Sequence, residues 1–212
     1  MWSIFFSFHA FFLNYNTFVT MKKVNLAVFA SGQGSNTENL IRYFANKPNI
    51  IIKCVVSNIP DAKVLEKSKK LNVETKVFAN SDFKTGERVN EYLKSKNIDF
   101  IVLAGFLRLI PTVLVNSFQD KIINIHPSLL PKHGGKGMYG RAVHQAVFDT
   151  KDTQTGITIH LVNDKYDEGD YIAQFFTNIN GVKSPEEIEQ KVRELENAYF
   201  PSTVESFITK KV

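Results

Sequence analysis

Apolar runs alternate with amphipathic segments along most of this 212-residue chain, and this alternation limits the folds that it can adopt. Near-continuous apolar runs predict buried strands, and the segments between them predict helices. The strands are expected at 24–30, 50–57, 73–78 and 99–105, and the helices at 37–45, 62–71 and 87–96. Strands without polar alternation are buried on both faces, which is typical of parallel sheets. We therefore expect an α/β fold, a Rossmann-like, open and mostly parallel twisted sheet with helices on both faces.

The same pattern continues through the second half of the chain. The run "KIINIH" at 121–126 predicts a strand, 139–148 a helix, and 155–162 and 171–178 two more strands. A last helix is expected to begin at Ser184, because Ser184, Pro185 and Glu187 match an N-cap, a first-turn proline and a capping-box acid. Neither a repeat nor a linker divides the sequence, so residues 21–212 are expected to form a single domain.

The first twenty residues, "MWSIFFSFHAFFLNYNTFVT", carry no Asp, Glu, Lys or Arg, whereas "MKKVNLAVFA" from Met21 has the pattern of a domain start. The segment lacks the positive n-region and the cleavage site of a signal peptide, and its apolar runs are too short to span a bilayer. We expect residues 1–20 to be an N-terminal extension or the result of a mis-assigned start. A membrane-associating segment and a targeting segment are the alternatives.

Composition restricts the kinds of partner. A net charge of +5 and a pI near 9.1 suit an anionic ligand, but the basic residues are scattered, so no nucleic-acid partner is expected. Cys54 is the single cysteine and lies in an apolar run, and the five histidines lack metal-ligand spacing. We expect a cytoplasmic protein with small-molecule substrates, no membrane partner and no metal.

The segment "SGQGSN" joins the first expected strand to the first expected helix. Backbone N–H groups and the helix dipole at such a junction favour a phosphate. Thr37 stands where a dinucleotide fingerprint has its third glycine, and the second strand ends in Ser57 and Asn58 instead of the acid that holds an NAD ribose. A mononucleotide-like phosphate fits better than NAD, and a tight turn whose glycines serve geometry alone is the alternative. The candidate phosphate-binding residues are Ser31, Gly32, Gln33, Gly34, Ser35 and Asn36.

Asn124 and His126 close the apolar run at 121–126 and are separated by one residue, so both side chains face the same side of an extended strand. Pro127 restricts His126 to extended backbone angles. An amide donor can stabilise an oxyanion, and a histidine moves protons near neutral pH, so the pair suits acyl transfer. Ligands of open α/β sheets bind beyond the carboxyl ends of strands, where this pair is expected. A pair that is simply hydrogen-bonded at a strand end is the alternative.

Three other features have both a functional and a plain structural interpretation. Asp167 lies in the acidic loop "VNDKYDEGDY"; leaning toward His126 it would favour the imidazolium, but most such loops are solvated turns. Residues 106–110 could line a slot for a flat aromatic ring, although their periodicity is that of ordinary core. Glu196, on the last helix, is by default a surface charge.

Five segments occur in the order seen in the phosphoribosylglycinamide formyltransferases: "SGQGSN", "AGFLRLIP", "NIHPSLLP", "TGITIHLVNDKYDEGD" and "ELENAYFP". The chain resembles this family of folate-dependent enzymes over essentially all of residues 21–212. The resemblance implies that the chain is a one-carbon transferase without a metal. It would move the formyl group of 10-formyltetrahydrofolate to the primary amine of 5'-phosphoribosylglycinamide in de novo purine (IMP) biosynthesis.

The resemblance also implies roles for individual residues. Asn124 and protonated His126 would hold the oxyanion, and Asp167 would support that charge and the proton transfer to the leaving folate nitrogen. The N-terminal part would bind the substrate phosphate on residues 31–36, with Glu196 near the glycinamide. The C-terminal part would bind folate. The folate contacts would be Phe106, Leu107, Arg108, Leu109, Ile110, Val162 and Asp164, with His160, Pro127 and Pro131 as supporting residues and the Leu130–Pro131 bond cis.

The chain departs from many relatives after "SLLP", where "KHGGKGMYGR" predicts a flexible flap near the active site whose residues have no assigned role. Methionyl-tRNA formyltransferase, which uses the same chemistry, is the first alternative, but it carries a further C-terminal domain. Formyltetrahydrofolate hydrolase has a regulatory N-terminal domain and tends to lack a proline at the position of Pro127. A non-catalytic nucleotide-binding module is the alternative from another class. A monomer or a homodimer is expected.

Overall fold

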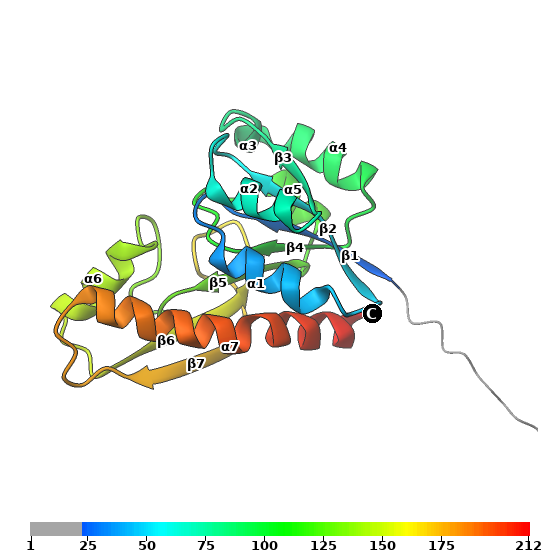
Figure 1. The fold of residues 1–212 in the computed structure, drawn as a ribbon. Helices are drawn as coiled ribbons and strands as arrows, with labels where there is room; N and C mark the ends of the chain where they lie inside the picture. Colours follow the sequence, from blue (N-terminus) through cyan, green and yellow to red (C-terminus); the bar gives the residue numbers. More distant parts are fainter. Residues whose placement is uncertain (1–22) are drawn as a thin grey trace, which may run out of the picture.

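Seven strands form one sheet within residues 23–212, which are the residues that this computed structural model describes (Figure 1). The extension predicted for residues 1–20 lies outside the described residues. The strands are β1 (Val24–Phe29), β2 (Ile50–Ser57), β3 (Glu74–Val77), β4 (Phe100–Leu103), β5 (Ile122–His126), β6 (Gln154–Leu161) and β7 (Tyr171–Asn178). The helices are α1 (Ser35–Phe44), α2 (Lys63–Lys70), α3 (Asp82–Thr85), α4 (Glu87–Ser95), α5 (Thr112–Ser117), α6 (Arg141–Asp149) and α7 (Pro185–Lys211).

The strand order is β3-β2-β1-β4-β5-β6-β7. Strands β1 to β5 are parallel, whereas β6 is antiparallel to β5 and β7 is antiparallel to β6. The predicted α/β fold with an open, mostly parallel sheet is therefore confirmed. The reversal at β6 places His160 opposite Asn124 and Thr158 opposite His126. Polar residues that are far apart in the sequence thus become neighbours at the carboxyl end of β5.

Helices cover both faces of the sheet, and the alternation of side chains along each strand feeds two separate cores. In β1, Leu26 and Val28 pack on the face covered by α1, α2, α6 and α7, while Ala27 and Phe29 pack on the face covered by α3, α4 and α5. All four of these side chains have no exposed surface. Burial of Leu26 or Phe29 stabilises the folded state by about 1.5–3 kcal/mol for each side chain. Packing in the two cores thus holds the ends of the strands in place.

The long helix α7 lies beside α1 along one face of the sheet (Figure 1). Its predicted N-cap is confirmed, since the Glu187 N–H donates to Ser184 Oγ over 3.4 Å. Pro201 lies inside the helix and has no N–H to donate to the carbonyl of Asn197, four residues earlier. Asn39 of α1 donates its side-chain amide to that carbonyl instead, over 3.1 Å. This contact fixes α7 against α1 beside residue 196.

Two short helices were not predicted from the sequence. Helix α5 has only six residues, "TVLVNS", of which three are β-branched and so have low helix propensity. Helix α3 has four residues, too few for a periodic pattern. The other predicted helices and strands are present, with boundaries that differ by one or two residues. No helix within residues 23–212 has the length and apolarity required to cross a membrane.

Candidate active site

A cavity of about 460 Å³ opens at the carboxyl ends of β4 and β5, between the start of α1, the loop before α6, the β6–β7 loop and α7. Its position agrees with the expectation for open α/β sheets. The structure brings these predicted site residues to its wall: Ser35, Asn36, Phe106, Leu107, Arg108, Leu109, Ile110, Asn124, His126, Pro127, His160, Val162, Asp167 and Glu196. It does not bring Ser31, Gly32, Gln33, Gly34, Pro131 or Asp164 to the wall.

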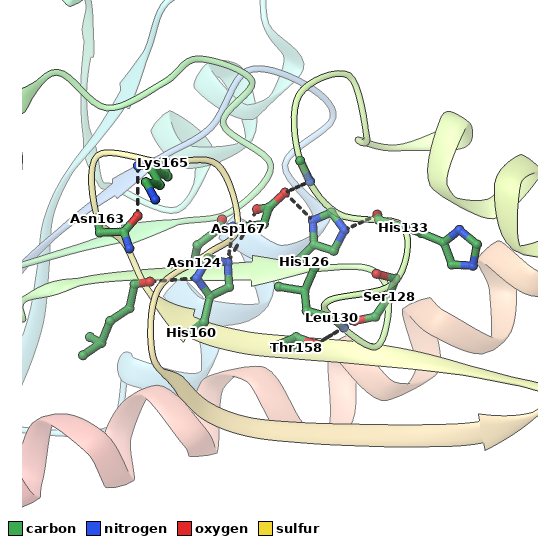
Figure 2. A network of polar contacts seen from close by, with 12 residues as sticks. Asn124, His126, Ser128, Leu130, His133, Thr158, His160, Asn163, Lys165 and Asp167 are labelled. Carbon is green, nitrogen blue, oxygen red and sulfur yellow. Dashed lines mark hydrogen bonds and ion pairs between the residues drawn. The ribbon is translucent and has the colours of Figure 1, made fainter.

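Asp167 reaches over the end of the sheet and lies between two histidines, as Figure 2 shows. Its Oδ2 is 3.5 Å from Nδ1 of His126, and its Oδ1 is 3.6 Å from Nε2 of His160. The Gly135 N–H donates to Asp167 Oδ2 over 2.9 Å and holds the carboxylate in this position. Asp167 has a φ of 57°, a left-handed conformation that turns the β6–β7 loop back toward β5. The proximity of Asp167 to His126 that the sequence only suggested is confirmed.

The hydrogen bonds of His126 determine which ring nitrogen can gain or lose a proton. Its Nε2 is 2.8 Å from the carbonyl oxygen of His133, and because a carbonyl only accepts, Nε2 carries a hydrogen. The titrating nitrogen is therefore Nδ1, which faces Asp167. Burial lowers the pKa of His126, and the negative charge of Asp167 opposes that effect. Burial thus favours the neutral ring, and the ring becomes a strong proton donor when charged.

His160 orients the amide of Asn124. The Nδ1 of His160 lies 2.7 Å from the carbonyl oxygen of Leu161 and donates to it, so the Nε2 of the neutral ring is an acceptor. Asn124 Nδ2 donates to that Nε2 over 3.0 Å. One amide hydrogen of Asn124 is thereby fixed, and the other is left to face a ligand in the cavity.

The Asp167 carboxylate stays ionised although it is largely buried. Burial alone would raise its pKa, but the His160 and His126 imidazoles when they are protonated, together with the Gly135 N–H, outweigh burial and lower the pKa below its usual value. A buried negative charge that is this well supported favours a positive charge on His126. The arrangement would stabilise positive charge that His126 gains during a reaction.

Ser31, a predicted phosphate-binding residue, lies away from the cavity wall. Its hydroxyl is buried, donates to Asn58 Oδ1 over 2.6 Å and accepts from the Leu107 N–H over 3.0 Å. A hydroxyl has one hydrogen, which here is used within the protein. Ser31 therefore ties the loop after β1 to the loop after β4 and has no hydroxyl hydrogen left to donate to a ligand.

The loop after β1 is shaped by Gly34, which is the N-cap of α1 and has a φ of 75°. A Cβ at Gly34 would lie 2.5 Å from Val64 Cγ2 and 2.8 Å from Val64 Cα, so no larger residue fits without displacement. This close approach to α2 directs the start of α1 at the cavity, where Ser35 and Asn36 lie in the wall. The loop thus offers the free N–H groups of a helix terminus.

Glu196 is partly buried in the wall of the cavity, close to Asn36. Burial raises the pKa of Glu196 to about 6, and the Asn36 side chain opposes that effect. Asn36 Oδ1 is itself buried and has no hydrogen-bond partner among the described residues. An unpaired buried acceptor is costly, so the two side chains form a polar corner suited to a ligand that donates hydrogen bonds.

The predicted folate-contact segment 106–110 has a mixed character. Phe106 and Ile110 are buried, and the Phe106 ring packs 5.3 Å from that of Phe29 in the second core. Leu107 and Leu109 are 47% and 40% exposed, a position that suits contact with an apolar ligand. The periodicity had indicated core for the whole segment, and the structure shows that only part of it is core.

Several cavity residues were missed in the sequence. His144 on α6 is buried, lines the cavity and has no partner for Nδ1 among the residues described. A histidine on the apolar face of an expected helix was the available signal. The flap residues 135–140, which were expected near the active site without assigned roles, also line the cavity, as do Lys165 and Tyr166 in the predicted folate-contact loop. Arg193 lines it too, and its exposed position on the last helix carried no signal. Within residues 23–212, no group of His, Cys, Asp and Glu side chains is arranged to hold a metal ion.

Comparison with known proteins agrees with this geometry. The sequence pattern of the family described as "Formyl transferase" matches residues 24–204. Phosphoribosylglycinamide formyltransferase of Haemophilus influenzae is 35% identical over 192 residues, which cover 88% of this chain and 87% of that protein. The enzyme of the same name from Bacillus subtilis is 34% identical, over 89% of this chain and 95% of its own.

Solved structures give the same result. The crystal structure of phosphoribosylglycinamide formyltransferase from Bacillus halodurans superposes with a TM-score of 0.80 at 30% identity, covering 89% of this chain and 97% of the other. That of Brucella melitensis has a TM-score of 0.78 at 31% identity, over 88% and 96% of the two chains. The chain therefore belongs to the formyl transferase family, together with the phosphoribosylglycinamide formyltransferases.

Proposed function

We propose that this protein transfers the formyl group of 10-formyltetrahydrofolate to the primary amine of 5'-phosphoribosylglycinamide, a step of purine biosynthesis. The observation that carries the proposal is the arrangement of Asn124, His126 and Asp167 in the wall of the cavity. Curated relatives of similar length that carry the name of this activity support it.

The ribonucleotide would lie along the start of α1. Its phosphate would accept hydrogen bonds from free backbone N–H groups there, aided by the positive end of the helix dipole. Asn36 Oδ1, an acceptor without a partner among the described residues, would receive a hydrogen from the sugar or the glycinamide. Glu196 would hold the amine end, since its carboxylate is ionised above about pH 6 and lies in the same corner.

The folate would lie against the loop after β4. Leu107, Leu109 and Val162 provide apolar surface there, and the loop backbone provides hydrogen-bonding groups for the edge of a flat ring. The folate supplies an activated formyl group and a nitrogen leaving group. In this arrangement the N-terminal part of the domain holds the phosphate and the C-terminal part, with the loop after β4, holds the folate.

The reaction requires stabilisation of charge on the formyl oxygen when the amine attacks. The free amide hydrogen of Asn124 and Nδ1–H of charged His126 would donate to that oxygen, because both side chains face the same side of β5. Asp167 would stabilise the imidazolium and, by way of water, relay the proton lost by the attacking amine to the folate nitrogen, which leaves as the tetrahedral intermediate collapses and its bond to the formyl carbon breaks. Each such donor contributes roughly 10²–10³ in rate. Alignment of two held reactants contributes at least as much.

The proposal is tested by formyl transfer from 10-formyltetrahydrofolate with the purified full-length chain. Phosphoribosylglycinamide, methionyl-tRNA and water alone serve as parallel acceptors. We expect rapid transfer to the ribonucleotide only. Release of formate without an acceptor would indicate a hydrolase, transfer to tRNA would indicate the other transferase, and silence with all three would refute the proposal.

A further inference from the structure

His133 occupies an unusual backbone conformation in the loop between β5 and α6. Its φ is 54°, in the left-handed region that residues other than glycine rarely adopt. In this conformation its carbonyl oxygen lies 2.8 Å from Nε2 of His126. The carbonyl is the group that keeps a hydrogen on Nε2, so the position of this one peptide decides the tautomer of His126 (Figure 2).

The side chain of His133 points away from His126 (Figure 2). It contacts an acid on another part of the chain. Its Nε2 lies 2.9 Å from Oδ2 of Asp152, in the connection between α6 and β6. The two side chains are only 11% and 16% exposed. Lys132 Nζ lies 3.2 Å from the other oxygen of Asp152, and Lys132 is 70% exposed. The mostly buried contact between His133 and Asp152 thus anchors the loop to the connection between α6 and β6.

We propose that Asp152 is a positioning residue: through the His133 ring it holds the His133 carbonyl in place, and so keeps the hydrogen of His126 on Nε2 and its titrating nitrogen toward Asp167. This inference rests on the proposed function, because it assigns His126 a part in the reaction. If the carbonyl moved away, neutral His126 could carry its hydrogen on Nδ1, and Nε2 would lose its partner. The fraction of His126 in the productive form would then fall.

Among residues 23–212, few charged and titratable groups surround the contacts that link His126, His133 and Asp152. Asp167, His160 and the His133 backbone face His126, and the charge of His144 on α6 also acts on that ring. Asp152 faces the His133 ring, and Lys132 faces Asp152. The His133 hydrogen bond, followed by Lys132, keeps the pKa of Asp152 below its ordinary value. Asp152 therefore remains an ionised acceptor over the pH range in which His126 titrates.

Three variants test the proposal: Asp152→Ala, Asp152→Asn and, as a matched control, Asp149→Ala. Asp149 is an exposed acid at the end of α6 that accepts a hydrogen bond from Gln145. We expect Asp152→Ala to lower kcat roughly 10–100-fold, the loss typical when a partner that orients a metal-binding histidine is removed. KM for both substrates should stay within about threefold, because the cavity wall is unchanged. Asp152→Asn keeps an acceptor for His133 and should retain most of the activity.

A second readout does not depend on activity. In ¹⁵N-histidine NMR spectra of the substrate-free protein we expect His126 of the wild type to carry its hydrogen on Nε2. The Asp152→Ala spectrum should show a mixture of tautomers and a shifted titration of His126. His133→Asn, which tolerates a positive φ, should give the same loss of kcat, and the double variant should be no worse than either single one.

The outcomes separate the two proposals. An active wild type with normal kcat in Asp152→Ala, or with an equal loss in Asp149→Ala, would overturn the positioning role. A loss of kcat with an unchanged His126 spectrum would overturn it too, since Asp152 would then act only on the stability of the loop. An inactive wild type whose His126 tautomer still changes in Asp152→Ala would refute the proposed function and support the role of Asp152.

Discussion

The loop after β1 and the polar end of β5 both face the cavity, but they are built in opposite ways. The loop presents exposed residues, such as Gly32 and Ser35, and the donors that it offers are backbone N–H groups at a helix terminus. At the end of β5 the groups are buried side chains, and His126 and His160 are 3% and 2% exposed. Substitutions in the loop should therefore alter the backbone conformation and change KM, whereas those at the end of β5 should change kcat.

The largest effect is expected for His126→Ala, which sharpens this comparison. The change removes the only ring whose Nδ1 faces Asp167 at 3.5 Å among the described residues, so we expect kcat to fall roughly 10³-fold. Affinity for the ribonucleotide, measured by calorimetry, should stay within about threefold, because the start of α1 is untouched. Turnover within tenfold of the wild type would remove His126 from the mechanism.

A smaller effect, on substrate binding instead of turnover, is expected for Gly34→Ala. The new Cβ would lie 2.5 Å from Val64 Cγ2, and the backbone is left-handed, so α1 must shift. We expect KM for the ribonucleotide to rise about 10–100-fold, since small misplacements of a binding group are costly, with little change in the rate at saturation. The unfolding free energy should fall by about 1–3 kcal/mol.

Gly32→Ala is the matched control for stability, because a Cβ there would meet nothing within 4 Å. Its melting temperature should equal that of the wild type. If Gly34→Ala lowered kcat and left KM unchanged, the loop after β1 would act on the chemical step instead of on binding, contrary to this comparison.

Glu196→Gln tests the corner where the two regions meet. The pKa of Glu196 is raised from 4.5 to about 6, so the folded state binds the proton more tightly and loses stability as the pH rises from 4.5 through 6. Removing the charge should therefore stabilise the protein at pH 7 by up to about 2 kcal/mol. The same change should raise KM for the ribonucleotide about tenfold, the cost of a lost charged hydrogen bond.

The pH profile gives a further check on Glu196. In the wild type, kcat/KM should rise as the pH passes through about 6, and in Glu196→Gln this rise should disappear. Glu194→Gln, on the exposed side of the same helix, is the control. A variant that is no more stable than the wild type at pH 7 and keeps the rise would show that the Glu196 carboxyl is not perturbed.

The smallest effect is expected for removal of residues 1–20. Among residues 23–212, every residue of the cavity wall lies at position 35 or beyond, and we expect kcat and KM to change less than about twofold. Steady-state assays of the full-length and shortened chains side by side measure this. A large loss of kcat would show that residues 1–20 take part in the site. The site would then consist of more than the loop after β1 and the end of β5.

The strands could be predicted from the sequence because each is a short apolar run, a signal that burial on both faces imposes locally. Asn124 and His126 were predictable for a related reason, since polar residues at the end of such a run stand out. Their orientation was not, because it depends on His160 and Asp167, which reach them only through the reversal at β6 and a left-handed turn.

Other parts of the site depend on contacts between distant residues. The sequence could not show that the Ser31 hydroxyl is used by Asn58 and the Leu107 N–H, because those partners lie 27 and 76 residues away. It also could not separate Asp164 from Asp167 within one acidic loop. Only the first lies away from the cavity wall, because the direction of each side chain depends on the turn.

The contact between Asn39 and the Asn197 carbonyl joins residues 158 positions apart and has a consequence for synthesis of the protein. The ribosome makes the loop after β1 early, but Glu196 and the helix that completes the same corner come last. A nascent chain can form the parallel strands before α7 emerges, yet it has no complete pocket for the nucleotide. Under the proposed function, nucleotide would therefore stabilise most strongly a chain whose last helix has docked.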